Sequence, residues 1–400
     1  MQYNFDEIID RTNTNSLSVE GWRQSILGAE QDYPVAFEDD LLRFWVADMD
    51  FATPPEIRDA IKSRLDQKIL GYTEVYDPDY YIALSKWFKR RYGVTINTNY
   101  MVFSPGVVPA LNRLVPLLTN AKENILITTP SYTPFKKAGD SNNRNVFTSP
   151  LLNNDGHFTI DFADIETKLS DSRNNIKLFI LCNPHNPTGR VWTEQELKTL
   201  VEICLKHDVW IISDEIHCDL LRHEQHFTSL QSLYPDHDRI ITCTAPSKTF
   251  NLAGCLISHI YIPNDIIRAE WQTKHGEILS PLSIAATQAA YTHCDNWLDE
   301  MRLYLDETFA LVEAFLHQNL PLAKFIVPES TYLAWIDLSA YLKDTQYMGN
   351  AGVLFAKEAG VLVEGANMFV DNGKGFIRMN IACPQSIVKK GLERIKSVLI

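Results

Sequence analysis

Two side chains that could do chemistry stand at the ends of apolar segments: an aspartate in IISDEIH (211–217) and a lysine in TAPSKTFNLAG (244–254). Asp214 needs a partner if it is buried, because an unpaired buried carboxylate costs several kcal/mol. Lys248 carries an amine that, in apolar surroundings, loses enough charge to form a Schiff base with a carbonyl group. A structural salt bridge for Asp214 and a solvated surface position for Lys248 are the ordinary alternatives.

Two segments rich in glycine and proline add polar groups of other kinds. In SPGVVPAL (104–111), the glycine lets the backbone approach a ligand, and the N–H groups of Val107 and Val108 would point from a helix N-terminus, which suits a phosphate. In CNPHNPTG (182–189), two Asn-Pro steps predict a rigid extended loop that holds the amide of Asn186. Simple turns are the alternative for both. A phosphate-binding helix, an amide, a carboxylate and a lysine together fit pyridoxal 5′-phosphate (PLP).

A sheet must position these segments, and the sequence predicts one between residues 100 and 262. Near-continuous apolar runs alternate there with amphipathic helical patterns, one of which begins at Thr193 with a T-x-x-E capping box. Such runs indicate parallel strands that are buried on both faces. They are NILITTPSY (124–132), KLFILCN (177–183), VWIISDEIH (209–217), RIITCTAPS (239–247) and CLISHIYI (255–262). The sequence therefore predicts an α/β doubly wound domain with its ligand at the carboxyl ends of the strands.

The two ends of the chain predict a smaller α+β domain. Thr53, Pro54 and Glu56 have the pattern of an N-cap, a first-turn proline and a capping box. A long helical pattern, a run of alternating character and a closing helix follow residue 280, at 303–316, 331–339 and 387–398. We expect residues 1–55 to form an N-terminal arm and part of the small domain, 56–290 the large domain, and 291–400 the C-terminal small domain. A cleft would lie between the two domains.

Composition excludes several classes of partner. The 400 residues carry 37 basic and 50 acidic side chains, a formal net charge of −13, which argues against nucleic acid. The one compact basic cluster, KWFKRR (86–91), is predicted to be a solvated helix face. No segment approaches the ~18 apolar residues that a membrane span needs.

The seven cysteines are never spaced CxxC and mostly fall in apolar runs, which indicates free thiols in the cytoplasm. HEQH (223–226) lacks the spacing of HExxH, so no metal site is predicted.

Several motifs carry a resemblance to known enzymes over nearly the whole chain. N-P-T-G (186–189), D-E-I-H (214–217) and S-K-T-F-N-L-A-G (247–254) resemble, in order and spacing, the fold-type I PLP-dependent aminotransferase superfamily. The chain is more narrowly similar to the MalY/PatB-type cystathionine β-lyases, or C–S lyases. That similarity lies in W-V-A-D-M-D-F (45–51), S-P-G-V-V-P-A (104–110) and R-M-N-I-A-C-P (378–384).

This resemblance implies a role for each candidate around the cofactor. Lys248 would form the Schiff base, and Asp214 would pair with the pyridinium. Asn186 and His217 would lie near the ring hydroxyl, and Tyr132 would stack on the ring face.

The resemblance also assigns the outer parts of the site. Val107 and Val108 would bind the phosphate through their backbone N–H groups, and Tyr72 would reach the phosphate of a neighbouring subunit, which implies a homodimer. Arg378 would bind the substrate α-carboxylate through a bidentate pair. Trp45, Asp48 and Met49 would shape the side-chain pocket, or would only anchor the N-terminal arm.

Two positions depart from the broader aminotransferase pattern. Ala245 replaces a phosphate-binding hydroxyl, and Leu256 stands where an arginine often lies, with Thr244 or Ser247 as substitutes for the phosphate contact. These departures weigh against an ordinary transaminase. The predicted activity is β-elimination from cystathionine, cysteine or related S-conjugates, giving a thiol, pyruvate and ammonia. An aminotransferase and a non-catalytic regulatory protein on the same fold are the alternatives.

Overall fold

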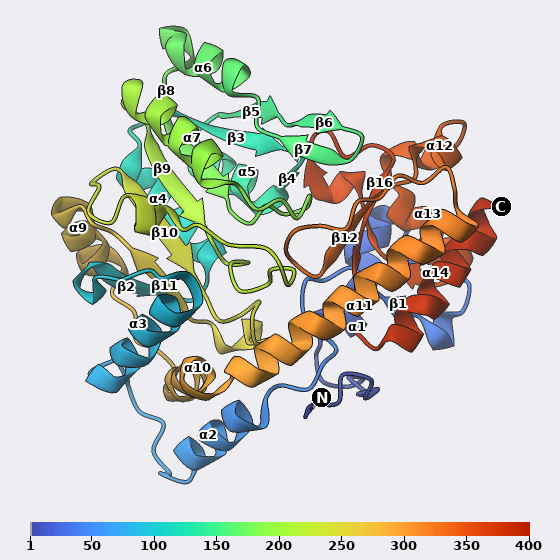
Figure 1. Cartoon of the computed structure of the whole chain (residues 1–400), viewed down its shortest axis with the longest axis horizontal. Coiled ribbons are helices and arrows are strands. Elements are labelled where there is room, and N and C mark those ends of the chain that lie inside the picture. Colours follow the sequence, from blue (N-terminus) through green and yellow to red (C-terminus); the bar gives the residue numbers. More distant parts are fainter. Residues whose placement is uncertain (1) are drawn as a thin grey trace.

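The computed structural model describes residues 2–400 and is built around a seven-stranded sheet (Figure 1). The strand order is β2-β11-β10-β9-β8-β3-β5, and all strands run parallel except β11. Their bounds are β2 (Met101–Ser104), β3 (Asn124–Thr129), β5 (Val146–Pro150), β8 (Ile176–Cys182), β9 (Trp210–Asp214), β10 (Ile240–Thr244) and β11 (Ser258–Tyr261). The five strands predicted from apolar runs are all present, but β11 was wrongly predicted as parallel, since it runs antiparallel to both β10 and β2.

Helices cover both faces of this sheet, as the continuous apolar strands predict. On β3, Ile125 and Ile127 pack in one cluster with α4 (Val107–Leu118), α5 (Thr133–Asp140) and α9 (Asp265–His275). The residue between them, Leu126, packs on the other side with α6 (Phe162–Ser170) and α7 (Glu194–Lys206). Alternate side chains thus enter opposite cores. The doubly wound α/β prediction is confirmed, and so is the capping box at Thr193, which starts α7.

The predicted start of α2 was wrong by one residue. This helix spans Pro55–Leu65, its N-cap is Pro54, and no side chain caps it. Pro54 has φ −45° and ψ 135° because the residue before a proline is pushed out of the helical region, here by Pro55. The first-turn proline is therefore Pro55, and Thr53 lies outside the helix.

Three helices flank the sheet near β2 and β11. They are α3 (Pro78–Tyr92), α10 (Pro281–His293) and α11 (Asp295–Asn319), and Figure 1 shows α11 running from α10 towards α14. The basic cluster lies on α3, where Trp87 is buried while Arg90 and Arg91 pair with Asp295 at 2.6 and 3.0 Å. Lys86, Lys89 and Arg90 are exposed, which confirms the predicted solvated face, and the two arginines also tie α3 to α11.

A smaller region contains a three-stranded antiparallel sheet of β12 (Leu333–Asp337), β16 (Phe376–Asn380) and β14 (Glu364–Gly365). Helices α13 (Ala351–Ala359) and α14 (Gln385–Leu399) pack beside it (Figure 1). Strand β1 (Leu42–Arg43) pairs in parallel with β13 (Val361–Leu362), so the start of the chain joins a region made mainly by its end.

The remaining short elements connect these two regions or lie at the surface. Strand β4 (Ser131–Tyr132), which follows β3, pairs with β15 (Phe369–Val370) of the smaller region. The others are α1 (Leu17–Glu20), β6 (Leu152–Asn154), β7 (His157–Thr159), α8 (Leu230–Leu233) and α12 (Ser339–Leu342). Across residues 2–400, no helix combines the length and the apolar character that crossing a membrane requires.

Candidate active site

The carboxyl edge of the large sheet gathers the polar segments, because β2, β8, β9 and β10 run in the same direction. Asp214, the last residue of β9, lies in register between Cys182 of β8 and Cys243 of β10. Its carbonyl oxygen accepts a hydrogen bond from Asn183 N at 2.9 Å. The loop that carries Asn186 is thereby fixed beside Asp214.

The carboxylate of Asp214 is buried without a cationic partner at contact distance. The residue is 5% exposed, and its Oδ1 accepts one hydrogen bond, from Ile216 N at 3.1 Å. Within residues 2–400 it makes no ion pair. Burial raises the pKa of Asp214 to about 7, against the opposing effects of that hydrogen bond and of the charge on Lys248. Such a carboxylate suits a cationic ring nitrogen placed next to it.

Lys248 projects into the same site from the loop after β10. Its Nζ donates a hydrogen bond to the carbonyl oxygen of Ala47 at 2.6 Å. Burial, and next the charge of Arg378, lower the pKa of Lys248 to about 8, while Asp48 and Asp214 oppose the shift. The amine therefore exchanges a proton near neutral pH, as a Schiff-base lysine and general base must.

The arm 45–51 is tied to the lysine loop and to the smaller region. The side chain of Asn251 accepts a hydrogen bond from Met49 N at 3.0 Å and donates one to Met49 O at 2.8 Å. Asn380 donates to the carbonyl oxygens of Val46 and Asp48 at 2.6 and 2.5 Å. These contacts hold the Ala47 carbonyl over Lys248.

Of the three arm residues predicted to shape a pocket, two have their side chains in packing positions. The indole of Trp45 donates to Ser18 O at 3.1 Å, in an apolar cluster with Trp22, and Met49 is 1% exposed in the main core. Asp48 is 2.6 Å from Arg11, and its charge acts on Lys248. The side chains of Trp45 and Met49 therefore anchor the N-terminal arm, which was the alternative prediction. Of the three residues, only Asp48 acts on Lys248, through its charge.

Arg378, on β16, brings the smaller region to the edge of the large sheet. Its Nη1 donates to Asn186 Oδ1 at 3.1 Å, and its Nη2 donates to Trp45 O at 3.0 Å. Its Nη2 also lies 2.5 Å from Glu364 Oε2. The guanidinium stacks 5.3 Å from the ring centroid of Phe369. Glu364 was not predicted from the sequence, although it follows the apolar run VLV as Asp214 follows its own strand.

Aromatic and histidine side chains complete the wall. His217 is 3% exposed, its Nδ1 has no hydrogen-bond partner within residues 2–400, and burial lowers its pKa well below the ordinary value, so the ring is neutral. The ring of Tyr332, another residue that was not predicted, lies 6.5 Å from it. Tyr132 is partly buried in β4, and burial raises its pKa.

The N-terminus of α4 offers donors for a phosphate. Gly106 is its N-cap, and the backbone N–H groups of Val107 and Val108 have no acceptor within residues 2–400, as expected in a first helical turn. Of the two proposed hydroxyl substitutes, Thr244 is buried with its side chain next to Tyr261, and Ser247 is partly exposed. Leu256 is 62% exposed and offers no donor. The unpaired Asp214 carboxylate, the orphaned His217 nitrogen and these donors fit PLP.

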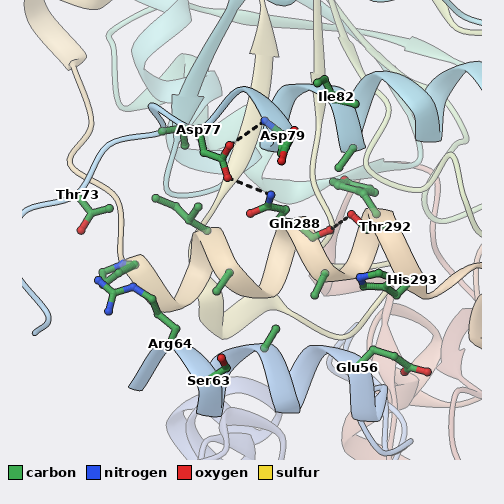
Figure 2. A pocket seen from close by; sticks show the side chains of 18 of the residues that line it. Glu56, Ser63, Arg64, Thr73, Asp77, Asp79, Ile82, Gln288, Thr292 and His293 are labelled. Atoms are coloured by element: carbon green, nitrogen blue, oxygen red, sulfur yellow. Dashed lines mark hydrogen bonds between the residues drawn. The ribbon is translucent and has the colours of Figure 1, made fainter. Parts of the chain in front are cut away.

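Tyr72 is the one predicted residue that stands apart. It is 94% exposed, forms no hydrogen bond within residues 2–400, and lines a shallow hollow with Leu70 and Ile278. Next to it, a groove of about 1190 Å³ runs between α2, α3 and α10 (Figure 2). Asp77 in this groove accepts hydrogen bonds from Asp79 N and from the side chain of Gln288. Neither hollow is lined by the other candidates.

Fold and site agree with a known family. Residues 39–395 match the family aminotransferase class I and II, and the chain belongs to that family. It is 41% identical to cystathionine beta-lyase PatB of Bacillus subtilis, over 90% of this chain and 93% of that protein. It is 31% identical to protein MalY of Escherichia coli, over 88% and 90% of the two chains. The structure resembles the PLP-bound C-S lyase from Staphylococcus hominis with a TM-score of 0.95 and 47% identity, covering 100% of this chain and 99% of that one.

Proposed function

We propose that this chain is a PLP-dependent carbon–sulfur lyase that carries out β-elimination on cystathionine and related cysteine S-conjugates. The observation that carries the proposal is the meeting of Lys248, Asp214 and Arg378 at one buried edge of the sheet. An amine of lowered pKa, an unpaired carboxylate and a guanidinium are the groups that bind PLP and an amino acid. The similarity to proteins named cystathionine beta-lyase and C-S lyase supports the reaction type.

Each end of the cofactor has a residue to hold it. Asp214 would keep a proton on the pyridine nitrogen, and the N–H groups of Val107 and Val108 would bind the phosphate. Asn186 and His217 would lie near the ring hydroxyl, with Tyr132 against the ring face. When bound, PLP supplies an aldehyde that condenses with amines and a ring that accepts the electrons released at Cα.

The chain's own groups then move the protons. Arg378 orients the α-carboxylate of the amino acid, and the Lys248 amine, once free, removes the α-proton as general base. Breaking of the Cβ–S bond releases a thiol, and hydrolysis of the remaining three-carbon fragment gives pyruvate and ammonia. The neutral ring of His217 adds no charge beside Lys248, which preserves the basicity of the amine.

The test is turnover without an amino-group acceptor. Purified protein with PLP and cystathionine, but no 2-oxo acid, is expected to release thiol and pyruvate through many turnovers. Turnover that needs an added 2-oxo acid would instead identify an aminotransferase. A series of S-conjugates with different thiol leaving groups, compared by kcat/KM, would define the preferred substrate.

We also propose a homodimer in which Tyr72 contacts the phosphate in the partner's site. The exposed apolar side chains around it, Ile69, Leu70, Tyr76 and Ile278, support a covered surface. Mixing Tyr72→Ala and Lys248→Ala proteins tests this, because a hybrid dimer contains one site with both native residues. Recovery of activity above that of either parent supports the shared site, whereas simple averaging of the two parents contradicts it.

Two further proposals concern the domain bounds and the location of the protein. We propose that residues 1–55 act as an arm of the smaller domain, 56–290 as the large domain and 291–400 as the C-terminal domain, which the pairing of β1 with β13 supports. We place the protein in the cytoplasm, because all seven cysteines are free and six are buried. Limited proteolysis and cell fractionation test these assignments.

A further inference from the structure

Glu364 is a partly buried carboxylate inside the site that the proposed reaction does not use. It lies opposite Arg378 in the antiparallel pairing of β14 with β16, and its Oε2 is 2.5 Å from Arg378 Nη2. The side chains of Glu364 and Arg378 are 13% and 2% exposed. The two residues form the most enclosed charge pair of the site.

The Nη1 and Nη2 groups of Arg378 already contact other oxygen atoms. A guanidinium binds a carboxylate bidentately through one of two edges, and both edges include Nη2. Nη2 donates to Trp45 O and forms an ion pair with Glu364 Oε2 at 2.5 Å, so two oxygen atoms already contact it, while Nη1 donates to Asn186. Only Nε lacks a partner within residues 2–400, and it is buried. A second carboxylate can therefore form a bidentate pair only if one acceptor leaves Nη2.

Glu364 is the acceptor that can leave. The Trp45 carbonyl is fixed by the backbone, whereas the Glu364 side chain can turn. Once it has turned away from Arg378, its negative charge has lost its counter-ion in a buried place, which is costly unless the carboxylate takes up a proton.

The burial of Glu364 favours that proton uptake. Burial raises the pKa of Glu364, and the charges of Arg378 and Lys248 oppose the rise. The phenol of Tyr132 also faces it. The ionisable side chains of the adjacent helix α13 do not compensate, because Lys357 pairs with Glu30 and Glu358 is exposed.

We propose that Glu364 is the resting counter-ion of Arg378, which the substrate α-carboxylate displaces, and that Glu364 takes up one proton from solvent as it is displaced. This inference rests on the proposed function for the identity of the substrate. Glu364 is a positioning residue, since it acts through Arg378. If Glu364 takes up a proton in this way, the affinity of the protein for carboxylate ligands falls as pH rises.

The test uses propionate, a carboxylate without an amine, and the PLP-loaded protein. Calorimetric titration at pH 8 in phosphate and in Tris measures the protons taken up per propionate bound. We expect close to one in the native protein and close to none in Glu364→Gln. With one linked proton, the native affinity falls about tenfold per pH unit between pH 7 and 9, while that of Glu364→Gln shows at most the slope due to Lys248 and Tyr132.

A matched control is Glu329→Gln. Glu329 pairs with the buried Arg190 outside the site. Its substitution therefore also removes a carboxylate charge from an ion pair with an arginine, but leaves Arg378 unchanged. It is expected to bind propionate like the native protein. For cystathionine at pH 8, Glu364→Gln should lower KM more than it changes kcat.

Equal proton uptake in the native protein and in Glu364→Gln overturns the inference. So does the absence of proton uptake when the native protein binds propionate. These outcomes are separate from failure of the proposed function. If cystathionine is not cleaved but propionate binds with proton uptake, only the reaction is misassigned. If cleavage is normal and uptake is absent, only the role of Glu364 is wrong.

Discussion

The amine of Lys248 and the carbonyl oxygen of Ala47 lie 2.6 Å apart, which joins the loop after β10 to the N-terminal arm. The hydroxyl of Tyr332, at the start of β12, donates to the same carbonyl at 2.9 Å. One backbone oxygen thus connects the large sheet, the arm and the smaller region. The position of the lysine depends on contacts made by both ends of the chain.

Replacing Lys248 by alanine should abolish both the covalent attachment of the cofactor and the elimination. The general-base contribution alone is typically 10²–10⁴-fold, so kcat should fall by at least about a hundredfold. The measurements are the acceptor-free pyruvate assay and the absorbance band near ~420 nm expected of lysine-bound PLP. Lys274→Ala, on the exposed end of α9, is the control and should keep both. Retention of the band in Lys248→Ala would contradict the assignment.

Lysine in place of Arg378 should weaken substrate binding while keeping the positive charge. An ammonium cannot reproduce the planar pair of donors, nor reach Asn186 and the Trp45 carbonyl together. We expect KM for cystathionine to rise on the order of 10- to 100-fold, as expected for loss of a charge-assisted hydrogen bond of about 1.5–3 kcal/mol. Steady-state kinetics check this, with Arg268→Lys as the control, because Arg268 pairs with Asp265 on α9. An unchanged KM would remove Arg378 from substrate binding.

Glu215, next to Asp214, should make stability depend on pH. Its carboxylate accepts from the hydroxyls of Ser213 and Ser229 at 2.9 and 2.6 Å, and burial raises its pKa from 4.5 to about 7. The folded protein thus binds this proton more tightly than the unfolded chain does. The resulting stabilisation is complete below pH 4.5 and is lost as pH rises through 7.

Glu215→Gln should remove that loss. Between pH 5 and pH 8, the free energy of unfolding of the native protein should fall relative to that of the variant by up to about 3 kcal/mol, at roughly 1.4 kcal/mol per pKa unit. Urea unfolding at the two pH values measures the difference. Glu202→Gln, on the exposed face of α7, is the control and should follow the native protein. Parallel pH dependence in native protein and Glu215→Gln would show that this carboxylate is not responsible.

The strands and the first polar groups could be predicted because their signals are local. A continuous apolar run predicts a buried parallel strand, and a polar residue at its end, such as Asp214 or Asn186, must lie at the carboxyl edge. The start of α2 was missed because two local rules conflict at Pro54, where the restriction imposed by the next proline overrides the preference for proline in a first turn.

Contacts made only in space could not be predicted in the same way. Glu364 lies in a two-residue strand, too short for a periodic pattern, and its partner Arg378 reaches it only through the pairing of β14 with β16. The role of Ala47 is carried by a backbone oxygen, which no residue type reveals. Tyr332 lies in the predicted run 331–339, but nothing in its neighbourhood indicates that its hydroxyl turns towards the arm.

Asp219 should couple the stability of the fold to the position of Lys248. This buried carboxylate accepts from the indole of Trp87 at 3.0 Å, from the hydroxyl of Thr249 at 2.6 Å, and from the phenol of Tyr92. Asparagine offers one acceptor oxygen to these three donors and turns an N–H₂ group towards one of them. Each donor left unsatisfied costs about 1–3 kcal/mol, so Asp219→Asn should lower the free energy of unfolding by at least about 1 kcal/mol.

Because Thr249 follows Lys248, Asp219→Asn should also reduce kcat several-fold, and Thr249→Val should reproduce the kinetic effect with a smaller loss of stability. Asp299→Asn supplies the comparison, since that carboxylate pairs with Arg91 at the surface, is 53% exposed, and should change stability by less than about 1 kcal/mol. Denaturant unfolding and steady-state kinetics on the three variants separate the two effects. If Asp219→Asn unfolds at the native midpoint, the three donors find other acceptors, and if its kcat is also unchanged, the coupling to Lys248 does not exist.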